Sequence, residues 1–405
     1  MAPVIIICGA IVPAVGAEML SVLLQNAMFI AGIATAVQLF PIWKIGARLP
    51  IVMGVSFTFV AILCAIASVH GPNAMVGAVI VGGLFEGMLG FFARYWRRFI
   101  TPIVAASVVT AIGISLFSVG TRSFGGGYAA DFGALDNLFL GSITLVTCII
   151  WLIFAKGHLK QLSVLGGLAV GYIGAIIMDK VDYSAISSAK LFAIPDFMPF
   201  TPEFNLSAIV SVCIIFMVSA AETIGDTSAL ASAALKRDPT NREISGALSC
   251  DGLASAVSGC FGVSPLTSFS QNIGLVAMTG VVNRFTILTG AGCMILAGLV
   301  PAVGQFFATV PQSVLGGCTI IMFGQIVLAG IEMISKCGFS QRNIIICSMS
   351  LSIGIGFTAS TEQGLWQNLP EMMREIFEAN VVAIVFVIAI VLNLILPKKM
   401  DIKKK

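Results

Sequence analysis

Thirteen long apolar runs divide this chain, and each one approaches or exceeds the length of about 20 residues that a helix needs to cross the hydrocarbon core of a membrane. Hydrophobic residues make up 58% of the 405 residues and charged residues only 10%, which leaves too little polar surface for a water-soluble fold. The sequence therefore predicts an all-α polytopic membrane protein. The runs lie near residues 18–40, 51–69, 74–92, 101–119, 138–155, 162–178, 206–235, 246–262, 263–281, 285–307, 313–333, 343–358 and 380–397, and a shorter run at 3–15 precedes them.

The basic residues test this division, because cytoplasmic loops carry an excess of Lys and Arg. With the C-terminus in the cytoplasm, 18 of the 22 basic residues fall on that side, and only Arg122, Lys180, Lys190 and Arg374 fall on the other. We therefore expect a multi-pass protein of the cell membrane with a cytoplasmic C-terminus. The basic tail 398–405 is interpreted as a topology determinant at the lipid surface, not as a nucleic-acid-binding segment.

The metal-ligating residue types show no clustering. Most of the ten cysteines lie inside apolar runs without a C-x-x-C pair, which is typical of small buried hydrophobic side chains. The two histidines, His70 and His158, fall in predicted loops. We therefore expect no metal site and no cofactor.

Two apolar runs, one in each half of the chain, are interrupted by polar residues and glycine. The first break is at 54–59 and the second lies within 264–280. Irregular backbone at membrane depth is tolerated where it lines a cavity or is packed in protein, and matching breaks in two halves indicate an inverted-repeat transporter with a central binding site. Gln271 and Asn272 bring amide donors and acceptors to the second break. The alternative is that both breaks are ordinary small-residue helix contacts.

Six acidic residues lie within the apolar runs, where a charge facing lipid costs about 2.5 to 3.5 kcal/mol. Glu222 and Asp226 are four residues apart and share one helix face. Two carboxylates this close disfavour joint ionisation, so this pair suits a proton relay. For Asp251 the relay and structural interpretations are both open. The other acids are interpreted as structural, because they lie near span ends or lack polar neighbours: Glu18, Glu86 and Glu332.

At these residues the chain resembles the nucleobase–ascorbate transporters, also called the nucleobase:cation symporter family. The segment 271–280 matches the family motif Q-N-x-G-x-x-x-x-T-G, and 222–226 matches the E-x-I-G-D passage of its eighth helix. The similarity covers essentially the whole chain. It extends to residues 46–57, to Asp251-Gly252 and to residues 311–318.

The resemblance implies a 14-helix fold of two inverted seven-helix repeats, arranged as core and gate domains, with short extended segments in helices 3 and 10. Residues 1–178 would form the first repeat, 179–205 an external loop, 206–397 the second repeat and 398–405 a cytoplasmic tail. The chain starts about midway along the family's first helix, without the Gln-His pair found there, so helix 1 is expected to be truncated. A misassigned start codon and a real shortening are both open. We also expect a homodimer.

The resemblance also implies a substrate site. Glu222 would accept hydrogen bonds from ring N–H groups of a nucleobase, Gln271 would pair with another edge, and the ring of Phe57 would stack on its face. The other residues predicted to bind substrate are Ser56, Ser270 and Asn272.

Proton coupling is expected from the acids of the same region. Asp226 and Asp251, together with Glu222, would be linked to the proton or would support the binding acid. We expect H⁺ as the coupled ion rather than Na⁺.

The identities at two positions point to a substrate class. Family members that carry uracil typically have Glu at position 271 and His at position 226, whereas this chain has Gln and Asp, as in the xanthine and urate branch. We therefore expect proton-coupled uptake of an oxopurine by alternating access. The alternatives are a uracil or other nucleobase permease of the family, or an anion transporter of similar architecture. A membrane enzyme is disfavoured, because the spans contain no His cluster or G-x-S-x-G elbow.

Overall fold

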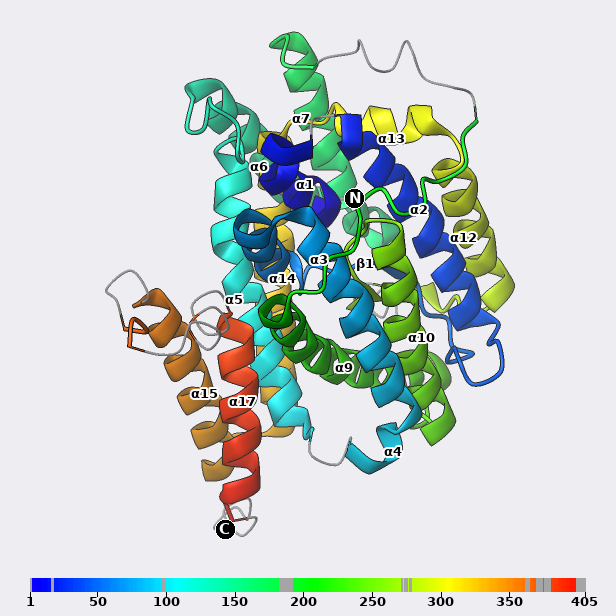
Figure 1. Ribbon diagram of the computed structural model, residues 1–405, viewed down its shortest axis with the longest axis vertical. Coiled ribbons are helices and arrows are strands. Elements are labelled where there is room, and N and C mark those ends of the chain that lie inside the picture. The colour runs from blue at the N-terminus through cyan, green and yellow to red at the C-terminus, as the bar shows by residue number, and fades with distance from the viewer. Residues whose placement is uncertain are drawn as a thin grey trace.

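The computed structural model describes residues 2–15, 18–96, 100–181, 192–270, 272, 276, 279–360, 365–368, 374 and 380–397. Within these residues the chain consists of helices and one two-stranded sheet (Figure 1). Seven of the described helices are both long and apolar enough to cross a membrane. The prediction of an all-α polytopic membrane protein is therefore confirmed.

The chain order of the elements matches the predicted runs in most places. The first half contains α1 (Ala2–Val15), α2 (Glu18–Leu39), β1 (Met53–Val55), α3 (Val60–Phe91), α4 (Ala93–Trp96), α5 (Pro102–Phe124), α6 (Leu135–Phe154), the 3₁₀ helix η2 (Gly157–Leu162) and α7 (Ser163–Ile177). The second half contains α9 (Leu206–Leu235), α10 (Asn241–Cys260), β2 (Leu266–Ser268), α12 (Arg284–Gly298), α13 (Pro301–Ala308), α14 (Gln312–Cys337), α15 (Gln341–Ala359) and α17 (Val381–Ile395).

The helices pack in two groups, as expected for a core domain and a gate domain. In one group α3 lies along α10 and α9, and α2 lies along α12 and α10. In the other group α14 lies along α5, α6 and α7, while α17 contacts α15 and α5. Figure 1 shows α2, α10 and α12 on the side of the molecule away from α15 and α17. Contacts of α9 with α5 and α17 join the two groups.

The predicted spans 51–69 and 74–92 correspond to two helical parts of α3 that meet at a kink, so the predicted boundary between them agrees with the structure. Helical structure begins at Val60, after β1 and a short turn, and the two parts of α3 are separated at Gly71, whose φ of 82° lies in the left-handed region. Glycine adopts this conformation without steric cost. The following Pro72 lacks the N–H that would continue the helical ladder.

The predicted span 285–307 is also not one straight helix. Its two parts, α12 and α13, are bent by 85° at a short break before Pro301. Proline disfavours helical geometry in the residue before it, and Val300 is extended with φ −109° and ψ 98°.

The extended segments predicted in helices 3 and 10 are confirmed, because β1 and β2 pair as antiparallel strands. Met53 lies opposite Ser268, and Val55 lies opposite Leu266. The run 263–281 was predicted as a span, but its described part begins with this strand. Gly54 is needed in the strand, since a Cβ there would overlap the ring of Phe269.

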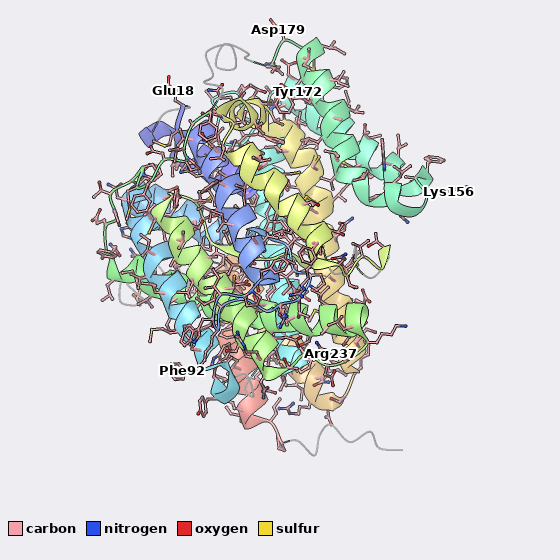
Figure 2. The ribbon with its side chains drawn as sticks, turned by 90° about the vertical axis from the view of Figure 1, so that its right-hand side faces the viewer. Glu18, Phe92, Lys156, Tyr172, Asp179 and Arg237 are labelled. Carbon is pink, nitrogen blue, oxygen red and sulfur yellow. The ribbon has the colours of Figure 1, made fainter. Side chains whose placement is uncertain are left out.

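Loops lie at both ends of the helix bundle. Figure 2 shows Glu18 and Asp179 at one end of the molecule, and Phe92 and Arg237 toward the opposite end. Near Arg237 a capping box starts α10: the Thr240 hydroxyl accepts from the Glu243 backbone N–H, and the Glu243 carboxylate accepts from the Thr240 N–H. Such a cap satisfies two N–H groups that the first turn leaves free.

Candidate substrate-binding site

Glu222 projects from α9 toward the backbone break between β1 and α3. The Thr58 hydroxyl in this break donates to Glu222 Oε2 over 3.0 Å. The Thr58 backbone N–H in turn donates to Ser56 Oγ over 3.3 Å. The break at 54–59 therefore presents a hydroxyl to the predicted substrate-binding acid. Sequence reasoning found the break but missed Thr58, although its hydroxyl was the available signal.

Two further predicted residues lie in the same break. Ser56 is buried, and its N–H donates to the Pro265 carbonyl over 3.0 Å, which extends the strand pairing by one step. Phe57 is half-buried, and its ring meets that of Phe323 on α14 edge-on, with centroids 5.3 Å apart. Phe57 therefore lies where the two helix groups meet.

Asp226 is connected to the second break in the same way. The Ser270 hydroxyl, two residues after β2, donates to Asp226 Oδ2 over 2.7 Å. Each of the two α9 acids thus accepts a hydrogen bond from a different break. Their spacing of one helical turn keeps them on one face of α9.

Asn272 ties the two breaks together. Its side-chain amide donates to the Pro50 carbonyl over 2.7 Å, just before β1, and its backbone N–H donates to the Phe269 carbonyl over 3.0 Å. These bonds hold the start of the second break against the first. Gln271, which was predicted to pair with the substrate edge, lies outside the described residues, as do Arg97, Arg98 and the tail 398–405.

Asp251 is completely buried and accepts hydrogen bonds from three elements. Thr223 of α9 donates over 2.6 Å, Gln38 of α2 over 2.9 Å, and the Ser268 N–H of β2 over 3.3 Å. All of these donors are neutral. Asp251 therefore joins α2, α9 and β2 at the level of the two breaks. Sequence reasoning did not select Gln38, which belongs to no recognised motif, or Thr223, which occupies the variable position of the E-x-I-G-D passage.

The acids interpreted as structural differ in their surroundings. Glu332 is exposed and pairs with Lys336 over 2.8 Å, and Glu18 is exposed at the start of α2. Glu86, in contrast, is completely buried in α3 and lies near Asp251 and Glu222. The expectation that Glu86 lacks polar neighbours was wrong, because α3 packs directly against α9 and α10.

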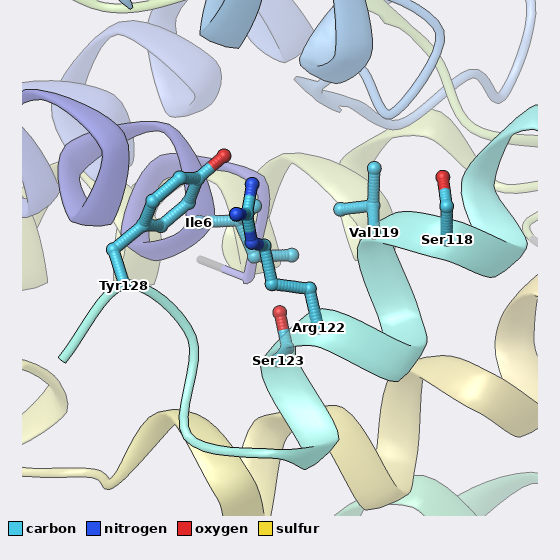
Figure 3. A pocket seen from close by; sticks show the side chains of 6 residues that line it. All are labelled: Ile6, Ser118, Val119, Arg122, Ser123 and Tyr128. Carbon is cyan, nitrogen blue, oxygen red and sulfur yellow. The ribbon is translucent and has the colours of Figure 1, made fainter. Parts of the chain in front are cut away.

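A separate cavity of about 300 Å³ lies between α1 and α5 (Figure 3). It is lined by Ile6, Ser118, Val119, Arg122, Ser123 and Tyr128. The Arg122 guanidinium lies 4.4 Å from the centroid of the Tyr128 ring, an arrangement in which cation and ring attract each other. None of the predicted site residues lines this cavity.

Comparison with known proteins decides the family. Residues 1–363 match the profile described as "Permease family". The "Xanthine permease" of Bacillus subtilis (strain 168) is 33% identical over 381 residues, which cover 93% of this chain and 86% of that protein. The chain belongs to the nucleobase–ascorbate transporter family. This permease is also 33% identical to the "Xanthine permease XanQ" of Escherichia coli (strain K12) over 94% of its own length and 84% of the relative's. It is 33% identical to the "Uric acid permease PucJ" of Bacillus subtilis (strain 168), in an alignment that covers 88% of this chain and 81% of that protein.

Solved structures of other transporters share the fold of this permease. The transmembrane domain of the cyanobacterium bicarbonate transporter BicA matches with a TM-score of 0.54 at 14% identity, over 97% of both chains. Murine Slc26a9 matches with a TM-score of 0.57 at 12% identity, over 87% of this chain and 69% of that one. The 14-helix architecture is therefore as expected. The permease is a membrane transporter and not an enzyme.

Proposed function

We propose that this permease takes up an oxopurine, xanthine or urate, across the cell membrane together with a proton, by alternating access and as a homodimer. The observation that carries the proposal is the pair of acids on α9: Glu222 and Asp226, one turn apart, each bound by a hydroxyl from a different break. The names of the relatives, xanthine and uric acid permeases, support the substrate class.

Recognition of the base is assigned to residues of both breaks. Glu222 accepts hydrogen bonds from ring N–H groups of the base. Thr58, which lies in the first break, orients the Glu222 carboxylate by donating to it. Phe57 offers a flat apolar face on which a planar base stacks. Gln271 pairs with the carbonyl-bearing edge, because its neutral amide both donates and accepts, whereas an ionised Glu only accepts.

Coupling is assigned to Asp226 and Asp251. Asp226 exchanges the proton, and Ser270 links it to the second break, where the base is bound. Asp251 holds α2, α9 and β2 in register through neutral donors. Symport requires that binding of the base and binding of the proton favour each other, which is a coupling free energy between two sites.

Alternating access fits the position of the site between two helix groups. Phe57 belongs to the group of α3 and α10, and its aromatic neighbour Phe323 belongs to the group of α14 and α5. Movement of one group against the other changes this contact and exposes the base to one side at a time. An inorganic-anion transporter of the same architecture is disfavoured, because the deep charges Glu222, Asp226 and Asp251 are acidic and an inorganic anion has no ring N–H groups to donate to them.

The test is uptake of labelled xanthine and urate by purified protein in proteoliposomes with an imposed inward proton gradient. We expect accumulation that collapses when a proton ionophore is added.

Gln271→Glu should weaken oxopurine binding by about 1–3 kcal/mol, the cost of leaving a buried polar group unpaired. Glu332→Gln, which alters an exposed ion pair, is the matched control. Uptake of bicarbonate or uracil in place of oxopurines would replace the proposal by one of its alternatives.

A further inference from the structure

The cavity between α1 and α5 lies at the boundary between the two helix groups (Figure 3). α1 packs mainly on α3 and α2 of one group, whereas α5 packs on α14 and α17 of the other. The rings of Phe57 and Phe323 meet at the same boundary. Next to the cavity residue Val119, a Cβ on Gly120 would lie 3.0 Å from an atom of the Phe323 ring. The cavity is therefore adjacent to the ring pair that borders the proposed substrate site.

The cavity lies toward the end of the bundle that the charge distribution predicts to be external. α5 begins shortly after Phe92, which lies at the predicted cytoplasmic end (Figure 2), and Arg122 lies in its last turn. A helix of this length carries the chain across the membrane, so its last turn lies toward the opposite end. Ser118, Arg122 and Tyr128 are exposed. A solute that arrives from outside therefore meets this cavity before it reaches the two breaks.

Arg122 supplies the only charge among the described residues that line the cavity. Its guanidinium lies 4.4 Å from the centroid of the Tyr128 ring, and no carboxylate in the described part of the chain forms an ion pair with it. A ring against one face of a guanidinium leaves N–H donors at its edge, in a planar fork that matches two acceptor atoms of an anion. The hydroxyls of Ser123 and Tyr128 add neutral donors. The cavity is therefore suited to a planar anion.

We propose that this cavity is an external entry site, where an oxopurine anion binds before it passes to the substrate site at the two breaks. Urate carries a negative charge at neutral pH, and its oxygens and ring nitrogens lie in one plane, so the Arg122 fork can donate to two of them. A volume of about 300 Å³ lies at the lower end of the usual range for small-molecule sites and suits a single fused-ring base. This inference rests on the proposed function for the identity of the substrate.

An entry site solves an electrostatic problem of the substrate site. The deep acids Glu222, Asp226 and Asp251 offer hydrogen-bond acceptors to ring N–H groups, but they do not attract an anion from solution. A positive charge at the external end of the pathway raises the local concentration of anionic substrate. Arg122 therefore acts on the capture of the base and not on its recognition at the breaks.

Uptake of labelled urate by intact cells, which exposes only the external side to substrate, tests the effect on transport. Arg122→Gln should raise the KM about tenfold, the scale of electrostatic focusing at a charged cleft, and leave the maximal rate unchanged. Arg122→Lys, which keeps the charge without the fork, should recover part of the affinity. Lys180→Gln, which removes a charge paired with Asp136 over 3.1 Å, is the matched control. An unchanged KM in folded Arg122→Gln, or an equal rise in the control, would overturn the proposal.

Protection of a cysteine at Ser118 measures occupancy of the cavity itself. The variant also carries Glu222→Gln, which disables the substrate site, and a replacement of the exposed Cys293. Urate should slow the reaction of the new cysteine with a membrane-impermeant thiol reagent, and Arg122→Gln should abolish this protection. Absence of protection by urate, or equal protection by chloride or bicarbonate, would overturn the proposal. If the unmodified protein fails to transport oxopurines, the proposed function fails, and protection at position 118 then decides separately whether the cavity binds the anion.

Discussion

At the scale of single residues, Glu222 and Asp226 lie on the same face of α9 but accept hydrogen bonds from different segments. Glu222 is bound by Thr58 from the first break, whereas Asp226 is bound by Ser270 from the second. The first break also carries Phe57, the proposed stacking ring. This division supports our proposal that Glu222 recognises the base and that Asp226 exchanges the proton.

The pair Glu222→Gln and Asp226→Asn tests this division. Glu222→Gln should lose about 1–3 kcal/mol of binding free energy, because the amide presents a donor to ring N–H groups that need an acceptor. Asp226→Asn should keep its affinity for xanthine, measured by calorimetry, but lose proton-driven accumulation in proteoliposomes. If Asp226→Asn still concentrates the base, Asp226 is structural and Asp251 becomes the candidate for coupling.

At the scale of secondary-structure elements, α3 and α10 pack closely beside the buried acids Glu86 and Asp251. α3 and α10 meet through Gly83, Gly87 and Gly252, where backbone replaces side chains in the interface. Small residues at such positions let membrane helices approach closely. The strand pair β1–β2 is held beside this interface, since Ser255 of α10 donates to the Leu266 carbonyl and accepts from its N–H.

Gly252→Ala should therefore destabilise the protein. The new Cβ would collide with the α3 backbone, and overpacking of this kind costs about 1–3 kcal/mol. Gly290→Ala on α12 is the matched control, because nothing lies within 4 Å of a Cβ at that position, and alanine favours a helix over glycine. Thermal unfolding of the detergent-purified variants measures both. Equal melting temperatures for the two variants would mean that the α3–α10 contact is not tightly constrained.

At the scale of the whole molecule, the distribution of basic residues predicts which end of the helix bundle faces the cytoplasm. The opposite ends of the bundle carry Glu18 and Asp179 on one side and Phe92 and Arg237 on the other (Figure 2). The excess of basic residues predicts that the end with Arg237 faces the cytoplasm.

Membrane-impermeant labelling of single cysteines measures this orientation in intact cells. A cysteine at Ala129 should react from outside, whereas cysteines at Arg97 and Lys405 should react only after the membrane is opened. The endogenous Cys293, the exposed member of the ten, has to be replaced first in all variants. Reaction of Ala129 and Lys405 from the same side would contradict the predicted number of spans.

The sequence by itself determined the features that depend on local chemistry. Apolar run length predicts where helices lie, since lipid offers no partner for free backbone groups. Breaks such as Gly54 and Gly71-Pro72 follow from residues that leave or interrupt helical geometry. The spacing of Glu222 and Asp226 places both on one face whatever surrounds them. Even here a predicted span needed correction, because the run 285–307 is bent by 85° at a short break before Pro301.

Only the tertiary structure decided which groups meet. Thr58 and Glu222 are 164 residues apart in the chain, and Gln38 and Asp251 are 213 apart. No periodicity within a helix predicts such pairs, because they depend on how α2, α3, α9 and α10 pack. The same packing buries Glu86 without a hydrogen-bond partner among the residues that the structure describes, although its sequence neighbourhood resembles an ordinary helix end. Burial changes the free energy of a charge, and it is a property of the assembled fold rather than of any local segment.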